Sequence, residues 1–169
     1  MRRISRDLRP GVLDDLGLGP ALKTLAEEFE ARTGITVSYS TVVFRNRLGP
    51  DAKIALYRIA QEALTNIERH SGATRVSVDI RGHKKGATLR IADNGSGLSD
   101  SEDRRATGLG LRNMQERIEQ LDGTLRIFSA RSGQSGEGTI IEAQVPLTHL
   151  LPQKSGTETP KEPPTKASA

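Results

Sequence analysis

The chain has 169 residues, no cysteine, a formal net charge of +4 and only 3% aromatic residues. This length fits one domain, and the lack of cysteine excludes disulfides and cysteine-ligated zinc. Few aromatic side chains are available to stack bases, and no apolar run is long enough for a transmembrane helix or a signal peptide. We therefore expect a cytoplasmic chain with no nucleic acid partner and no direct membrane contact, whose basic charge serves a phosphorylated small molecule.

The first eighteen residues indicate the end of one helix and a connector. Residues 2–9 are polar and charged, and Pro10 with Gly11 stops the helix. Apolar residues up to Leu18 then form the connector. Because the helix begins without a capping residue, we expect it to be the end of a longer segment.

Residues 19–147 alternate between helical and strand patterns. Apolar residues at helical spacing predict three helices, at 21–31, 51–69 and 108–121. β-branched or alternating segments predict five strands, at 35–44, 75–82, 87–93, 124–130 and 139–145. Two further segments lack periodicity: we expect 98–107 to be a mobile loop and 148–169 a disordered tail.

An acidic residue stands at the end of one predicted strand. Asp93 follows an apolar run, and Gly95 and Gly97 come directly after it. Glycine permits positive φ and close approach of a ligand, so a carboxylate beside these glycines could meet a planar group. An ordinary strand-end turn explains the same residues equally well. A calcium loop is excluded, because Leu98 and Arg104 occupy the positions that need Gly and Glu.

Two more groups of polar residues and glycines carry a possible site. Glu62 and Asn66 are one helical turn apart on the face of the 51–69 helix opposite its apolar stripe, where they could also be a solvated pair. Gly108 and Gly110 open the last predicted helix. They lack the third glycine of a dinucleotide fingerprint and follow a polar segment, and no Walker-type phosphate loop occurs in the chain.

Taken in order, these groups resemble a known nucleotide site. Together with Gly138-Thr139, they resemble the site of the gyrase, chaperone, histidine kinase and MutL ATPase superfamily. The segment 56–70, with the sequence LYRIAQEALTNIERH, resembles the asparagine box of two-component sensor histidine kinases of the nitrate-sensor and thermosensor-like subfamily. The resemblance covers residues 2–146. It implies an α/β fold, a two-layer α/β sandwich with a mixed sheet of about five strands and helices on one face (the Bergerat ATP-binding fold).

The resemblance also implies a role for individual residues. Asp93 would accept a hydrogen bond from the adenine amino group, Asn66 would help to hold Mg²⁺ on the phosphates of ATP, and Glu62 stands where hydrolytic relatives carry a general base. The other nucleotide-binding residues that it implies are Arg69, His70, Gly95, Gly97, Leu98, Gly108, Leu109, Gly110, Leu111 and Thr139.

The histidines of the chain bear on whether the phosphate acceptor lies in this part of the kinase. A histidine kinase transfers phosphate to a histidine on its dimerisation helix, and none of the three histidines, His70, His83 and His149, stands in such a helix. We therefore expect 1–18 to end a dimerisation helix and its connector, and 19–147 to be the ATP-binding catalytic domain. The expected partners are ATP, the histidine-bearing helix of the same homodimeric kinase and a response regulator. Two alternatives are an ATP hydrolase in which Glu62 activates water, and a non-catalytic nucleotide-sensing module.

Overall fold

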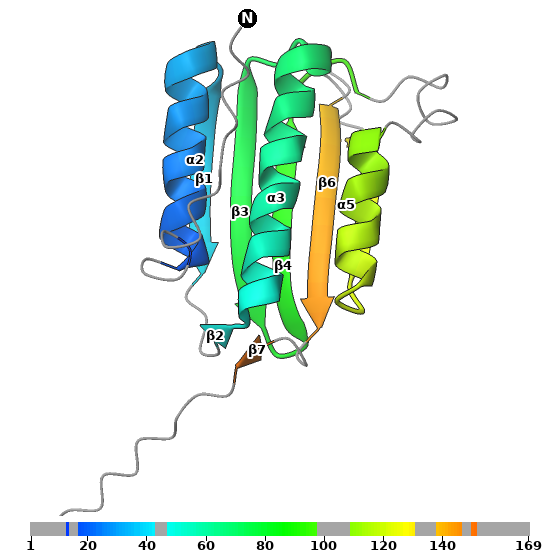
Figure 1. The fold of residues 1–169 in the computed structure, drawn as a ribbon. Coiled ribbons are helices and arrows are strands. Elements are labelled where there is room, and N and C mark those ends of the chain that lie inside the picture. The colour runs from blue at the N-terminus through cyan, green and yellow to red at the C-terminus, as the bar shows by residue number, and fades with distance from the viewer. Residues whose placement is uncertain are drawn as a thin grey trace, which may run out of the picture.

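A computed structural model of the chain describes residues 13, 17–42, 47–97, 109–130, 138–146 and 150–151. These residues form two layers, a five-stranded sheet with helices packed on one of its faces (Figure 1). The predicted fold class is confirmed. Within the described residues, no helix combines the length and the apolarity that crossing a membrane requires.

Among the described residues, three α-helices cover the sheet. They are α2 (Leu18–Thr33), α3 (Pro50–Asn66) and α5 (Leu109–Glu119). Helix α2 begins at Leu18, ahead of the predicted start, and ends at Gly34, whose left-handed backbone lets its N–H bond to the Glu30 carbonyl at 2.8 Å. Helix α3 has Pro50 in its first turn, where the missing proline N–H costs nothing.

The C-terminal end of α3 differs from the prediction. After Asn66 the chain enters a five-residue π-helical turn, η1 (Ile67–Ser71), which ends at the left-handed Gly72. A π-helical turn bonds residues five apart and is wider than an α-helical turn. The helix predicted at 51–69 therefore ends as an α-helix at Asn66, and Arg69 and His70 lie in the π-helical turn.

The sheet has the strand order β1-β3-β4-β6-β5. Strand β1 (Thr36–Val42) runs parallel to β3 (Arg75–His83), and the remaining pairs are antiparallel. The other three strands are β4 (Gly86–Asp93), β5 (Thr124–Ala130) and β6 (Gly138–Pro146). A separate pair, β2 (Arg47–Leu48) with β7 (Leu150–Leu151), was not predicted. Leu150 and Leu151 thus form a strand where we expected a disordered tail.

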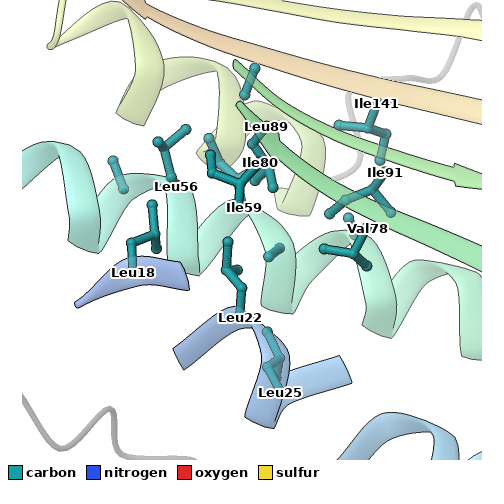
Figure 2. Close-up of a cluster of buried hydrophobic side chains, with 14 of the residues drawn as sticks. Leu18, Leu22, Leu25, Leu56, Ile59, Val78, Ile80, Leu89, Ile91 and Ile141 are labelled. Carbon is teal, nitrogen blue, oxygen red and sulfur yellow. The ribbon is translucent and has the colours of Figure 1, made fainter. Parts of the chain in front are cut away.

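The core lies between the helices and the sheet (Figure 2). Because side chains alternate along a strand, one face of each strand is apolar and points toward the helices. Burying a large aliphatic side chain contributes about 1.5–3 kcal/mol relative to leaving it exposed. The most deeply buried side chains labelled in Figure 2 are Leu22, Leu56, Ile59, Val78, Ile80, Leu89 and Ile91.

The opposite face of the sheet is mainly polar. Asp79, Arg90, Glu142 and Arg126 stand side by side on four neighbouring strands, each opposite a residue of the other sign. Opposite charges at paired positions favour this register. An antiparallel sheet commonly packs one face on the core and leaves the other to water, as this one does.

Candidate nucleotide-binding site

The ends of several elements meet at one end of the sheet (Figure 1). Strand β4 ends there, β6 and α5 begin there, and α3 passes into η1. Most of the described residues that the sequence singled out lie on these elements, so the fold brings together segments that are far apart in the chain.

Asp93, the last residue of β4, is the buried carboxylate of this end of the molecule. It is 8% exposed, and among the described residues it is the one buried polar or charged side chain. Its Oδ1 accepts a hydrogen bond from the Gly95 N–H at 2.7 Å, and the backbone N–H of Thr139 also bonds to the carboxylate. Burial raises the pKa of Asp93, and these two backbone hydrogen bonds oppose that rise.

Gly95 is required by a contact within the protein. A Cβ at this position would lie 2.3 Å from the carbonyl oxygen of Ser71 and 2.7 Å from its Cβ. The next residue, Ser96, donates its N–H to the same carbonyl at 2.8 Å. The loop after β4 is therefore held against the end of η1. Gly97 follows with a φ of 73°, in the left-handed region that favours glycine.

Asn94 joins the same loop to β3. Its Oδ1 accepts the N–H groups of Thr74 and Arg75 at 3.0 and 2.8 Å, and its Nδ2 donates to the Thr74 hydroxyl at 3.0 Å. The Asn94 N–H also bonds to the Arg75 carbonyl. The side chain thus fixes the loop between η1 and β3 beside the end of β4.

The start of β6 lies against Asp93. A Cβ on Gly138 would sit 1.8 Å from the Asp93 carbonyl oxygen, so only glycine permits this approach. The approach brings the Thr139 N–H to the Asp93 carboxylate. Thr139 is therefore beside Asp93.

Glu62 lies against the start of α5, and Asn66 is one helical turn further along α3. A Cβ on Gly110 would be 2.0 Å from the Glu62 Oε1, so the backbone of the first turn of α5 lies directly against the Glu62 carboxylate. Both Glu62 and Asn66 are partly exposed. The start of α5 thus faces the Glu62 carboxylate, and the first N–H groups of a helix have no partner within that helix.

The other residues that the resemblance implied are placed less closely. Arg69 and His70 are exposed on η1. Leu109 is 76% exposed, whereas Leu111 packs against the core. Leu98 and Gly108, together with the predicted loop 98–107, lie outside the described residues.

Three supporting residues escaped the sequence analysis. Ser71 and Asn94 act through contacts with Gly95 and with the start of β3, which no local pattern reveals. Gly138 was noticed only as part of a Gly-Thr pair. The signal that could have found it is its place at the head of a strand that pairs with the one ending in Asp93.

A buried carboxylate at a strand end, a glycine-containing loop and a helix start beside a second carboxylate fit an ATP-binding domain. A family model described as the histidine kinase-, DNA gyrase B-, and HSP90-like ATPase matches residues 51–149, more than half of the chain. The chain therefore belongs to this ATPase family, as an ATP-binding domain of the sensor histidine kinase type.

Curated relatives agree with this family. The chain is 43% identical over 154 residues to the sensor histidine kinase MctS of Rhizobium johnstonii, covering 90% of this chain and 32% of MctS. It is 36% identical over 148 residues to the oxygen sensor histidine kinase NreB of Staphylococcus carnosus, covering 88% of this chain and 42% of NreB. The chain thus spans less than half the length of these relatives.

Solved structures share the fold. The histidine kinase domain of the Erythrobacter litoralis EL346 blue-light activated histidine kinase matches 78% of this chain and 61% of its own, with a TM-score of 0.60 at 21% identity. The ATP-binding domain of PrrB from Mycobacterium tuberculosis matches 76% of this chain and 93% of its own, with a TM-score of 0.58 at 22% identity.

Proposed function

We propose that this chain binds Mg-ATP and transfers the γ-phosphoryl group to a histidine on a dimerisation helix of the same kinase, within the cytoplasm. A response regulator is the expected next acceptor. The observation that carries the proposal is Asp93, a buried carboxylate that already accepts two backbone N–H groups and has lone pairs left for a ligand donor.

Asp93 supplies the base specificity in this proposal. A carboxylate accepts a hydrogen bond from the adenine amino group, whereas guanine offers a carbonyl at that place and would leave two acceptors facing each other. Thr139 and the loop held by Asn94 lie beside the carboxylate, and we expect them to border the adenine base.

The phosphates would lie between α3 and the start of α5. Free N–H groups in the first turn of a helix favour anions, but the helix dipole contributes only about 0.3–2 kcal/mol. Arginine charge and a metal ion must therefore supply much of the binding energy, and Arg69 is an exposed candidate on η1. Glu62, next to Gly110, would accept the proton of the attacking histidine.

Asn66 is the residue that we propose as a ligand of Mg²⁺. Mg²⁺ prefers oxygen ligands and is commonly held by substrate phosphates with one or two protein groups. Within the described part of the chain, no three His, Cys, Asp or Glu side chains gather into a group that could hold a metal. A single amide oxygen beside a triphosphate fits this pattern, and the bound ion would neutralise phosphate charge.

Calorimetric titration with Mg-ATP and Mg-GTP tests the proposal. The unaltered chain should bind ATP at least about a hundredfold more tightly than GTP. Asp93→Asn should weaken ATP binding by about 5- to 150-fold, because asparagine has one acceptor oxygen and must turn its amide donor toward a backbone N–H or the adenine amino group. Asp79→Asn makes the same change on the polar face of the sheet and should leave the affinity unchanged. Equal affinity in Asp93→Asn and the unaltered chain would exclude Asp93 as the adenine contact.

A further inference from the structure

The π-helical turn η1 connects the two halves of the candidate site. It begins directly after Asn66, and it ends at Ser71, whose carbonyl accepts the Ser96 N–H at 2.8 Å and lies against Gly95. Two exposed basic side chains, Arg69 and His70, lie within the turn. The path of η1 therefore sets where these side chains lie relative to Asn66 and Asp93.

A π-helical turn is a rare conformation and needs support from its surroundings. Part of that support comes from α2. In the last turn of this helix, Nη1 of Arg32 donates to Oε1 of Glu68, the second residue of η1. The pair joins two elements that are 36 residues apart in the chain.

The Arg32 side chain is itself held in place by an aromatic ring of the same helix. Its guanidinium carbon lies 5.7 Å from the centroid of the Phe29 ring, and Phe29 is buried in the core. A guanidinium over an aromatic face is attracted to it and loses some of its freedom to move. The side chains of Arg32 and Glu68 are 38% and 36% exposed, respectively, so the pair is only partly screened by water.

We propose that Arg32 is a positioning residue for the nucleotide: through Glu68 it fixes η1, and so the placement of Arg69 toward the phosphates. The inference rests on the proposed function. Arg32 itself does not touch the ligand. If the Arg32–Glu68 pair were an ordinary surface ion pair, it would add a little stability to the fold without changing the affinity for ATP. A positioning role differs, because it acts on ATP binding through the placement of Arg69.

Calorimetry with Mg-ATP on a set of variants separates these roles. Arg32→Gln should weaken ATP binding about two- to fivefold, the range for losing one partly exposed ion pair. Glu68→Gln should weaken it to a similar extent. Arg32→Lys keeps the charge but not the planar fork over Phe29, and should give an intermediate affinity.

A double-mutant cycle then identifies the route of the effect. In an Arg69→Ala background, Arg32→Gln should cause no further loss, because the residue that it positions is already gone. Lys23→Gln is the matched control: it breaks the exposed Lys23–Glu27 pair on the same helix and should not change the affinity.

Two results would overturn the inference. One is an Arg32→Gln variant that binds ATP as tightly as the unaltered chain. The other is an equal loss with and without Arg69. If Arg32→Gln does not fold, the exchanged pair Arg32→Glu with Glu68→Arg replaces it and must restore the affinity. Failure of the unaltered chain to bind ATP would overturn the proposed function as well, whereas the first two results leave it standing.

Discussion

The Asp93 carboxylate gives the domain a stability that depends on pH. The pKa of Asp93 in the folded protein is raised above its ordinary value of 3.8. Between pH 3.8 and this raised pKa, the native state holds more protons than the unfolded state. The stability that comes from the preferred protonation of Asp93 in the native state is therefore fully present below pH 3.8. It is lost as the pH rises through the raised pKa.

Urea unfolding of the unaltered chain and of Asp93→Asn, without nucleotide, tests this dependence. The free energy of unfolding of the variant minus that of the unaltered chain should increase as the pH rises from about 3.8 and should level off above the raised pKa, because asparagine does not titrate. Other acidic residues titrate in both proteins and cancel in the difference. A difference that falls with pH would mean that the carboxylate is stabilised by its hydrogen bonds more than it is destabilised by burial.

Asn94 should matter for stability more than for chemistry. Asn94→Ala removes three side-chain hydrogen bonds to Thr74 and Arg75, and we expect it to lower the free energy of unfolding by about 1–3 kcal/mol. Asn113→Ala is the matched control, because Asn113 is exposed on α5 and alanine is the better helix former. Chemical denaturation measures both. Equal effects of the two changes would show that the Asn94 hydrogen bonds merely replace bonds to water.

These residues also show what a sequence can predict at this scale. Asp93 was found because an apolar strand delivers one carboxylate to two nearby glycines, a pattern local to a few residues. The reason for Gly95 was not found, because the atoms that require it belong to Ser71. Contacts of this kind join residues that are far apart in the sequence, and no local periodicity predicts them.

At the scale of elements, the approach of α5 to α3 depends on Gly110. The three atoms nearest to a Cβ at this position all belong to the Glu62 side chain, so alanine would displace the end of a flexible side chain. Gly110→Ala should therefore keep the fold but misplace Glu62. With a histidine-bearing dimerisation helix supplied, we expect phosphoryl transfer to fall by up to about 100-fold.

Single-turnover assays with radioactive ATP measure this loss. The double change Gly110→Ala with Glu62→Gln should be no slower than Glu62→Gln alone, because both act on one carboxylate. Gly19→Ala is the control, since a Cβ in this first turn of α2 meets its nearest neighbour, the Tyr39 hydroxyl, at an ordinary 3.5 Å. A double variant much slower than Glu62→Gln would assign Gly110 a separate role.

The elements themselves were predicted where their pattern is long. Helices and strands with several turns or alternations, such as α3 and β4, match the apolar spacing of the sequence. The prediction failed where the signal is short: η1 replaces the last turn of a helix, and β2 and β7 are two-residue strands. A π-helical turn leaves the residue types unchanged and alters only their rotation, so composition cannot reveal it.

At the scale of the whole molecule, the layered fold separates two tasks. The helix-covered face of the sheet carries the core, and the opposite face carries charges of alternating sign in a row across neighbouring strands. The site lies at one end of this frame, where strands end and helices begin. The fold class, and the grouping of these motifs into one site, followed from the resemblance to a known family. The contacts that hold the segments together, such as Gly95 against Ser71 and Gly110 against Glu62, needed the structure.

The histidines of the chain lead to the last prediction. The ring of His83 is engaged by the Thr88 hydroxyl and the Lys85 N–H, at the end of β3 opposite to the one beside Asp93. His70 is exposed on η1, within a turn whose last residue, Ser71, bonds to Ser96. In-line transfer needs the acceptor nitrogen opposite the leaving oxygen, and about 1 Å of misplacement can cost about 100-fold.

We therefore expect this chain to bind Mg-ATP without labelling itself when it is given radioactive ATP. A histidine-bearing dimerisation helix of the same kinase, added in trans, should become labelled. Glu62→Gln should slow this transfer by about 100-fold or more while changing ATP affinity little, because a general base acts only in the transition state. Gln61→Ala, one residue earlier on the same helix, is a control for helix perturbation. One result would contradict the assignment of the acceptor to a separate helix: the chain alone becomes labelled with acid-labile phosphate, and His70→Gln abolishes the label. His70 would then be the acceptor.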